Sequence, residues 1–268
     1  MIGGIDLETN GFDIIRKLLE IAHTDSTVFP PTQLYNEGWM LRILLAIQAE
    51  EKECFPFSYH QRARWFSEAE LNSPFLRRWR TTKNRPKDEL AEGHTHTDGA
   101  IGHFEFRPDT KTGLSLTEDS TQFVVVEAKM DSPLSPGVTN DPDYDQAART
   151  VACMAWTIYE SKRAVGDLLS LGFYVIAPED QIKKGVFEEE MRKSSIEDKV
   201  RTRVNRYMND VEKYEELQEW LKEFFIPTLE CIDIGCVSWE DTIDKTNNRS
   251  IWNFYEQCRK FNKPKRRG

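Results

Sequence analysis

The chain has 268 residues, of which 39% are hydrophobic and 30% charged, and its formal net charge is −9 at pH 7. This length supports one large domain with a well-buried core. The acidic net charge does not indicate a nucleic-acid partner, although net charge averages over all faces of a protein. No apolar run reaches membrane-spanning length, and no basic segment followed by an apolar one opens the chain, which predicts a cytoplasmic protein without membrane attachment.

Cysteine usage is typical of a reducing compartment. The five cysteines are odd in number and form no Cys-x-x-Cys pair, so we expect free, mostly buried thiols and no structural zinc. They are Cys54, Cys153, Cys231, Cys236 and Cys258.

Two helices are predicted before the first strand. Apolar residues recur at helical spacing over residues 11–23. After the breaker at residues 29–31, Thr32 is a suitable N-cap for a helix that reaches about Glu50. Glu37 lies in the first turns of this second helix, where the helix dipole favours an acid.

The segment of residues 60–87 is basic and aromatic. It contains eight basic residues and two acidic ones, with tryptophan and phenylalanine interleaved. Such a segment can follow a phosphate backbone and stack on bases, but a solvated surface whose tryptophans belong to the core has the same composition. The candidate nucleic-acid contacts in it are Arg77, Arg78, Trp79 and Arg80.

Two neighbouring strands are predicted within residues 97–129. An alternating run over residues 97–106 is followed by a polar loop at 108–119, and an apolar, β-branched run then begins at Phe123. The loop folds the first strand back beside the second, as in a hairpin. The second strand has the composition of one that is covered on both faces, at the centre of a sheet.

Charged residues stand at the ends of these two strands. Glu127 and Lys129 project from one face because strand side chains alternate, and the hairpin brings Asp98 near Glu127. Two carboxylates and an ammonium can hold a hard divalent cation beside a water, which is phosphodiester chemistry. Glu-x-Lys occurs four times in the chain, but only this triplet ends a strand-like run. The alternative is a set of solvated charges where a strand leaves the sheet.

Asp98, the hairpin and Glu127-Ala128-Lys129 together resemble the PD-(D/E)XK phosphodiesterase superfamily, whose fold is restriction-endonuclease-like. Thr97 stands where the name-giving proline would be, and that proline supplies no ligand. The resemblance covers about residues 33–177. It implies an α/β fold with a mixed β-sheet flanked by helices on both faces and extra N- and C-terminal helices.

The resemblance also implies an active site. Asp98 and Glu127 would ligate Mg²⁺ or Mn²⁺ together with the backbone carbonyl of Ala128, and Lys129 would orient the attacking water. In many members a glutamate on the helix before the sheet reaches the metal directly or through water, and Glu37 is the candidate here.

A loop after Lys129 is followed by residues 141–146, which lead into a helix that is predicted to end near Gly172. The next strand, at residues 173–177, is predicted to lie parallel to an earlier one. In exonuclease-like branches of the superfamily a glutamine of this helix contacts the metal site or a nearby phosphate, and Gln146 matches it. Thr150 replaces the tyrosine that those branches carry four residues later. Arg149 is a candidate phosphate contact, and both candidates are equally compatible with polar surface.

The remainder of the chain is predicted to be mostly helical, with a strand at residues 231–239 and a closing helix at about 250–261. The charged residues of 180–223, Arg201, Arg203 and Arg206 among them, are expected to form a solvated helical surface. We expect a single nuclease-like domain over residues 1–268, with a catalytic core at about 33–177 and additions at about 178–268.

The sequence His94-Thr95-His96-Thr97-Asp98 also matches the H-x-H-x-D of metallo-β-lactamase-like hydrolases. That site needs further histidines downstream, and the last histidine here is His103. A zinc hydrolase is therefore disfavoured, and His94 and His96 are expected in a loop near the site mouth.

The sequence thus predicts a Mg²⁺- or Mn²⁺-dependent nuclease that acts on nucleic acid, with DNA favoured. A non-catalytic nucleic-acid- or protein-binding module on the same fold is the main alternative, and unrelated small-molecule chemistry is the third. The choice of DNA or RNA, endo- or exonucleolytic cutting and the oligomeric state stay open.

Overall fold

A computed structural model describes residues 15, 20, 30–50, 53–76, 88–138 and 140–262. Within these residues, five strands form one mixed sheet in the order β1-β2-β5-β6-β7. β1 pairs with β2 and β2 with β5 in antiparallel fashion, whereas β5, β6 and β7 run parallel to one another. A separate two-stranded ladder joins β3 and β4. The strands are β1 (Arg64–Leu71), β2 (Thr95–Gly102), β3 (Phe104–Phe106), β4 (Leu114–Leu116), β5 (Gln122–Ala128), β6 (Ser170–Ala177) and β7 (Asp233–Ser238).

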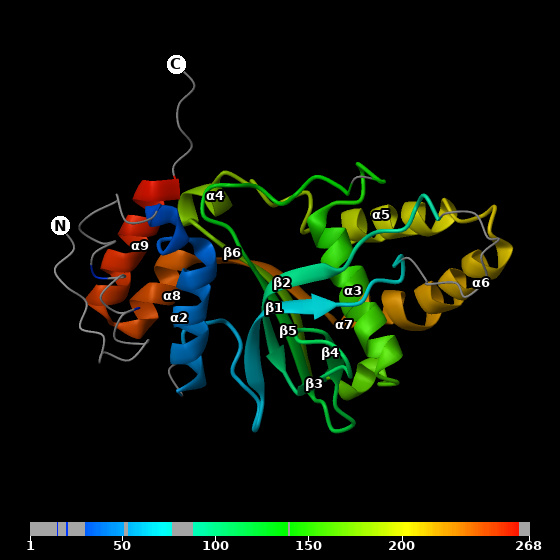
Figure 1. Cartoon of the computed structure of the whole chain (residues 1–268), viewed down its shortest axis with the longest axis horizontal. Coiled ribbons are helices and arrows are strands. Elements are labelled where there is room, and N and C mark those ends of the chain that lie inside the picture. Colours follow the sequence, from blue (N-terminus) through cyan, green and yellow to red (C-terminus); the bar gives the residue numbers. More distant parts are fainter. Residues whose placement is uncertain are drawn as a thin grey trace, which may run out of the picture.

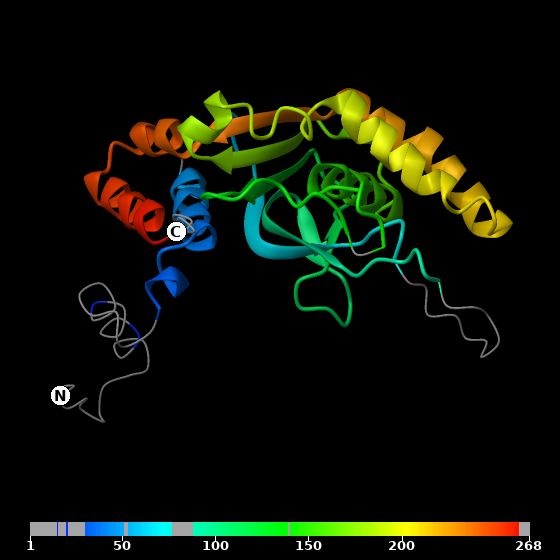
Figure 2. The same cartoon turned by 90° about the horizontal axis from the view of Figure 1, so that it is seen from above.

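Helices cover both faces of the sheet. In Figure 1, α2, α8 and α9 lie on one side of the strands and α3, α5, α6 and α7 on the other, and Figure 2 shows the same separation from above. The helices are α2 (Glu37–Ala49), α3 (Gln146–Glu160), α4 (Glu179–Lys183), α5 (Lys193–Asn205), α6 (Val211–Trp220), α7 (Ile226–Cys231), α8 (Trp239–Thr246) and α9 (Arg249–Asn262). Short 3-10 helices occupy Pro31–Gln33 and Val165–Asp167, and a π-helical turn occupies Leu221–Phe225.

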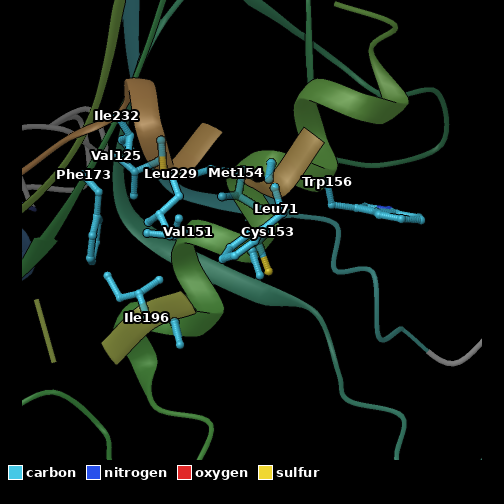
Figure 3. Close-up of a cluster of buried hydrophobic side chains, with 14 of the residues drawn as sticks. Leu71, Val125, Val151, Cys153, Met154, Trp156, Phe173, Ile196, Leu229 and Ile232 are labelled. Carbon is cyan, nitrogen blue, oxygen red and sulfur yellow. The ribbon is translucent and has the colours of Figure 1, made fainter. Parts of the chain in front are cut away.

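Each face of the sheet has its own hydrophobic core. Between the sheet and α3, Val125 and Phe173 pack against α3 residues such as Val151, and α5 and α7 close this core from outside (Figure 3). On the other face, the alternate strand residues Val124 and Val126 pack under α2, α8 and α9. Burial on both faces explains the continuous apolar run of β5.

The α/β architecture with helices on both faces of a mixed sheet is confirmed. The strand predicted at 173–177 is β6, parallel to β5 as expected. The strand predicted at 231–239 is β7, and it extends the same sheet with residues beyond the predicted core. The closing helix is confirmed as α9. The helix predicted at residues 11–23 lies outside the described residues, apart from Ile15 and Glu20.

The second helix begins later than predicted. Thr32 lies in the 3-10 helix, and α2 starts at Glu37 because Asn36 is its N-cap. The Asn36 side chain accepts a hydrogen bond of 2.9 Å from the Trp39 N–H, which satisfies one of the free donors of the first turn.

The predicted hairpin is interrupted. β2 and β5 pair as expected, but β2 ends at Gly102, whose φ of 142° disfavours any other residue. A Cβ at this position would lie 2.0 Å from the Gln122 carbonyl oxygen, so the backbones approach too closely for a side chain. The chain then forms the β3–β4 ladder, in which β3 is the last part of the predicted first strand and β4 lies inside what the sequence predicted to be a polar loop.

The prediction that the crossover helix ends near Gly172 is wrong. α3 ends at Glu160, and Lys162 then adopts a left-handed conformation with φ of 53° that turns the chain away from the helix axis. Ser161 also leaves the helix to bond β4, where its hydroxyl accepts a hydrogen bond from the Leu116 N–H.

All five cysteines are free, and Cys54, Cys153 and Cys258 are buried, as the sequence predicted for most of them. Among the described residues, no helix combines the length and apolar character that crossing a membrane requires.

Candidate active site

Asp98 and Glu127 lie opposite each other at the end of the β2–β5 ladder. The ladder's last backbone pair is Gly99 with Val126, and continuing its register places Asp98 beside Glu127. Instead of a further backbone bond, the Asp98 carboxylate accepts a hydrogen bond of 2.7 Å from the Ala128 N–H. The structure therefore brings together the two acids that the sequence predicted to act as a pair.

A kink in β1 lies directly beside Asp98. Residues three apart in a regular strand point to opposite faces, yet Phe66 and Ala69 both contact the core on the α3 side. Glu68 lies between them with φ of 58°, in the left-handed region. The pairs on either side, Ser67 with Gly99 and Ala69 with Thr97, place Glu68 opposite Asp98. The kink reverses which side of β1 faces the α3 core, and Asp98 lies opposite the residue where this reversal occurs.

α3 supplies two hydrogen bonds to Glu127, whose side chain is almost fully buried. Gln146 Nε2 donates to Glu127 Oε2 at 2.9 Å, and Thr150 Oγ1 approaches Oε1 at 3.5 Å. Gln146 Oε1 in turn accepts from the Ser135 N–H, which fixes the orientation of the amide. Gln146 was predicted at this site. The role of Thr150 was not, although its position one helical turn after Gln146 was the available signal.

Burial and the neighbouring Asp98 carboxylate, which also shares a hydrogen bond with Glu127, raise the pKa of Glu127 well above its usual value. The positive charges of Lys129 and Arg149 act in the opposite direction. Two acids this close cannot both ionise cheaply without a cation between them. A cation bound between the two carboxylates would therefore favour the loss of a proton from the pair.

Hydrogen bonds hold both backbone polar groups of Lys129. Its N–H donates to the Ile176 carbonyl at 2.9 Å, and its own carbonyl accepts from Trp239 Nε1 at 2.9 Å. The half-buried Lys129 side chain therefore projects from a well-fixed backbone position, one residue after the end of β5. Its positive charge acts on Glu127.

The donor set fits a hard divalent cation. Carboxylate and carbonyl oxygens are the ligands that Mg²⁺ and Mn²⁺ prefer. The N–H and C=O of one strand residue point to the same side, so the Ala128 carbonyl faces the β2 edge, to which its N–H donates. Asp98, Glu127 and this carbonyl would hold the ion. Within the described residues, no group of three or more His, Cys, Asp or Glu side chains gathers as a metal site.

Glu37 is the first residue of α2. It lines an open hollow of about 260 Å³ with Met130, Asp131, Ser132 and Asn262. Over the described ranges, Glu37 forms no hydrogen bond or ion pair with Asp98 or Glu127. Its predicted role as a metal ligand, direct or through water, stays a prediction.

The charge of Arg149 acts on two buried acids. It acts electrostatically on Glu127 and on Glu92, and its Nε is buried with no hydrogen-bond partner in the described structure. Burial raises the pKa of Glu92, while the hydrogen bond from Ser73 and the charge of Arg203 oppose this shift. Glu92 was missed by the sequence reasoning. The predicted contacts Arg77, Arg78, Trp79 and Arg80 lie outside the described residues.

The prediction that Arg203 is solvated is wrong. Arg203 is fully buried and pairs with Asp141 at 3.2 Å. Arg203 belongs to α5 and Asp141 to the loop that precedes α3, so the ion pair joins the helix to this loop. Arg206 also pairs with Asp141, at 3.1 Å, and Lys199 pairs at 2.5 Å with Asp145, the N-cap of α3. α5 thus holds the first turn of α3, which carries Gln146. Arg201, from the same predicted surface, is exposed as expected.

The two histidines of the H-x-H-x-D sequence both contact Glu70. His94 Nδ1 lies 3.2 Å and His96 Nε2 3.8 Å from its carboxylate, which also pairs with Arg107 at 2.7 Å. His96 belongs to β2 and not to a loop, since β2 begins at Thr95.

No family model, curated protein or solved structure matches this chain. Support for a function therefore comes from the chemistry of the site itself.

Proposed function

We propose that this protein is a Mg²⁺- or Mn²⁺-dependent nuclease of the restriction-endonuclease-like, PD-(D/E)XK type, and that DNA is its favoured substrate. The observation that carries the proposal is the Asp98–Glu127 pair. One of these acids is buried with a raised pKa, and the other is held by the backbone N–H of Ala128. The order of β2, β5, α3 and the parallel β6 supports the same proposal.

Each residue of the site has a role in this chemistry. A bound cation lowers the pKa of a coordinated water and offsets charge on the phosphate. Gln146 and Thr150 hold the Glu127 carboxylate in one orientation. Lys129 hydrogen-bonds the attacking water and stabilises negative charge as that water loses its proton. Arg149 contributes a positive charge near the scissile phosphate.

A non-catalytic binding module is the second candidate. It is favoured by one observation: within the described residues, no third His, Cys, Asp or Glu side chain gathers with Asp98 and Glu127 as a metal site, and a third carboxylate would strengthen metal binding. The presence of Asp98, Glu127 and Lys129 together supports the catalytic proposal instead.

The test is cleavage of a panel of linear and circular duplex DNA, single-stranded DNA and RNA with Mn²⁺, with Mg²⁺ and with chelator. The parent protein is compared with Lys129→Ala. Metal-dependent cutting that is lost in the variant supports the nuclease and identifies its substrate. Binding to one panel member without any cutting supports the non-catalytic module.

A further inference from the structure

Glu92 is a buried acid to which the proposed chemistry gives no role. It lies in the segment that leads into β2, and Ser73 Oγ donates a hydrogen bond to its Oε1. The Glu92 N–H donates to the Phe75 carbonyl at 2.9 Å, which fixes the backbone. Over the described residues, the other carboxylate oxygen, Oε2, is buried and accepts no hydrogen bond. Leaving such an acceptor unpaired is costly, so a donor is expected nearby.

Contacts on both sides of Glu92 place its segment against the start of α3. The carbonyl of the preceding residue accepts a hydrogen bond of 2.7 Å from Asn140 Nδ2, in the loop before α3. Three residues after Glu92, Thr95 Oγ1 accepts from Cys153 Sγ at 3.5 Å, on α3 itself. Arg149 lies on the same face of α3, one helical turn before Cys153. The segment that carries Glu92 therefore packs along the part of α3 that carries Arg149.

Two arginines act on Glu92, and one of them is already paired. Burial raises the pKa of Glu92, while the hydrogen bond from Ser73 and the charges of Arg203 and Arg149 oppose this shift. Arg203 uses both terminal nitrogens elsewhere, since Nη1 donates to Asp141 at 3.2 Å and Nη2 donates to a backbone carbonyl. Arg149 makes no such pair among the described residues, and its Nε is buried without a hydrogen-bond partner. The donor available to Glu92 is thus on Arg149.

Tyr144 adds a third buried polar group to Glu92 and Arg149. Its hydroxyl also has no partner in the described part of the chain, and both other residues act on it electrostatically. The three groups are complementary, because the carboxylate accepts, the guanidinium donates and the hydroxyl can do either. One bridging water would satisfy all three.

We propose that Glu92 is a positioning residue that holds the Nε edge of the Arg149 guanidinium and leaves its terminal nitrogens for a substrate phosphate beside Glu127. The proposal rests on the proposed nuclease function and adds the residue that fixes its phosphate contact. In the sequence Arg149 stands between Gln146 and Thr150, which both hydrogen-bond Glu127. Its side chain is only half-buried, so part of it reaches solvent. A guanidinium held along one edge loses less freedom when the other edge binds a phosphate.

The test uses Glu92→Gln, which keeps the size of the side chain. The amide has a single oxygen, which Ser73 holds, so an amide N–H₂ replaces the acceptor that Arg149 needs. Binding is measured by fluorescence anisotropy in chelator, with labelled duplex DNA, single-stranded DNA and RNA. Through the general field alone, loss of a negative charge would strengthen nucleic-acid binding. The positioning role predicts the opposite sign, a loss of about five- to tenfold.

A double variant and a matched control make this test specific. Arg149→Met is expected to weaken binding about tenfold, and adding Glu92→Gln to it should have no further effect, because Glu92 acts through Arg149. Glu89→Gln is the same exchange at an exposed position of the same segment and should not weaken binding. Binding by Glu92→Gln that equals or exceeds the parent's overturns the proposal. A full second loss in the double variant overturns it as well.

A readout without nucleic acid separates this inference from the nuclease proposal. The Arg149 Nε–H signal in ¹⁵N NMR is assigned by its absence in Arg149→Met. It should be protected from exchange with water in the parent and in Glu89→Gln, and unprotected in Glu92→Gln.

Protection that persists in Glu92→Gln contradicts the positioning role, whatever the protein cuts. Metal-dependent cutting with an unchanged KM in Glu92→Gln also contradicts that role alone. Protection and binding that both depend on Glu92, without any cutting, contradict catalysis and support the positioning role.

Discussion

Asp98 accepts a hydrogen bond of 2.7 Å from the Ala128 N–H, at the position where the β2–β5 ladder stops forming backbone pairs. A side chain thus replaces the backbone as the partner of a strand donor. This exchange holds the carboxylate at the sheet edge and turns the Ala128 carbonyl toward it. The same feature ends the ladder and builds the acidic site.

In the absence of divalent metal, Glu127→Gln is expected to stabilise the protein, because it removes a buried carboxylic acid whose ionisation costs free energy. Because the pKa of Glu127 is higher in the folded than in the unfolded protein, protonated Glu127 contributes to the free energy of unfolding. This contribution is complete below about pH 4.3, the pKa of a glutamate in the unfolded chain, and is lost as the pH rises through the pKa in the folded protein. The melting temperature of the variant should therefore exceed that of the parent increasingly from pH 5 to pH 8, by about 2–4 °C for each kcal/mol. A difference that does not change with pH contradicts this account.

Divalent metal is expected to stabilise the parent protein through Asp98. An ion that binds only the folded state at 10–100 times its Kd adds roughly 1.4–2.7 kcal/mol, which thermal melts in Mn²⁺ can measure. Asp98→Asn should abolish the shift. Glu37→Gln is the matched variant, and it should keep the shift if Asp98, Glu127 and the Ala128 carbonyl hold the ion without Glu37. Loss of the shift in Glu37→Gln instead would place Glu37 among the groups that hold the ion.

Thr150→Val removes one hydroxyl near Glu127 while keeping the shape of the side chain. Since Thr150 is fully buried and its hydroxyl donates to the Glu127 carboxylate, kcat should fall about fivefold, corresponding to roughly 1 kcal/mol, with little change in KM. Steady-state kinetics on the substrate identified by the cleavage panel checks this. A change confined to KM would contradict the assigned role.

Arg203→Met is expected to lower stability by about 3–5 kcal/mol, because it removes the buried partner of Asp141 and leaves this buried acid paired only with the partly exposed Arg206. For a chain of this size the melting temperature should fall by about 6–20 °C. Arg201→Ala is the control on the same helix. Arg201 is 45% exposed and pairs with Glu197 at 2.7 Å, so its loss should cost at most about 1 kcal/mol. Similar losses in both variants would contradict a structural role specific to Arg203.

The sequence predicts the centre of this molecule better than its margins. The apolar run that ends in Glu127 and Lys129 identified β5, and the hairpin argument correctly placed Asp98 beside Glu127. Both depend on strand periodicity, which is local. Gln146 was likewise placed correctly, by resemblance to a family motif.

Features that depend on tertiary contacts were not predictable in this way. Arg203 has the sequence context of a solvated helix, but its burial follows from the position of Asp141, 62 residues away. The kink at Glu68 requires a left-handed conformation that no glycine signals. Thr150 was noted only as a departure from the motif, and its contact with Glu127 depends on how α3 crosses the sheet.

The most direct test of the central claim is single-turnover cleavage in Mn²⁺ by the parent protein, Asp98→Asn and Glu127→Gln, on the substrate that the panel identifies. Both variants keep the size of the side chain and should remain folded. We expect each to lose at least about 100-fold in rate, because each removes a charge that the reaction requires. A folded Glu127→Gln protein that cleaves as fast as the parent would contradict the assignment of this site.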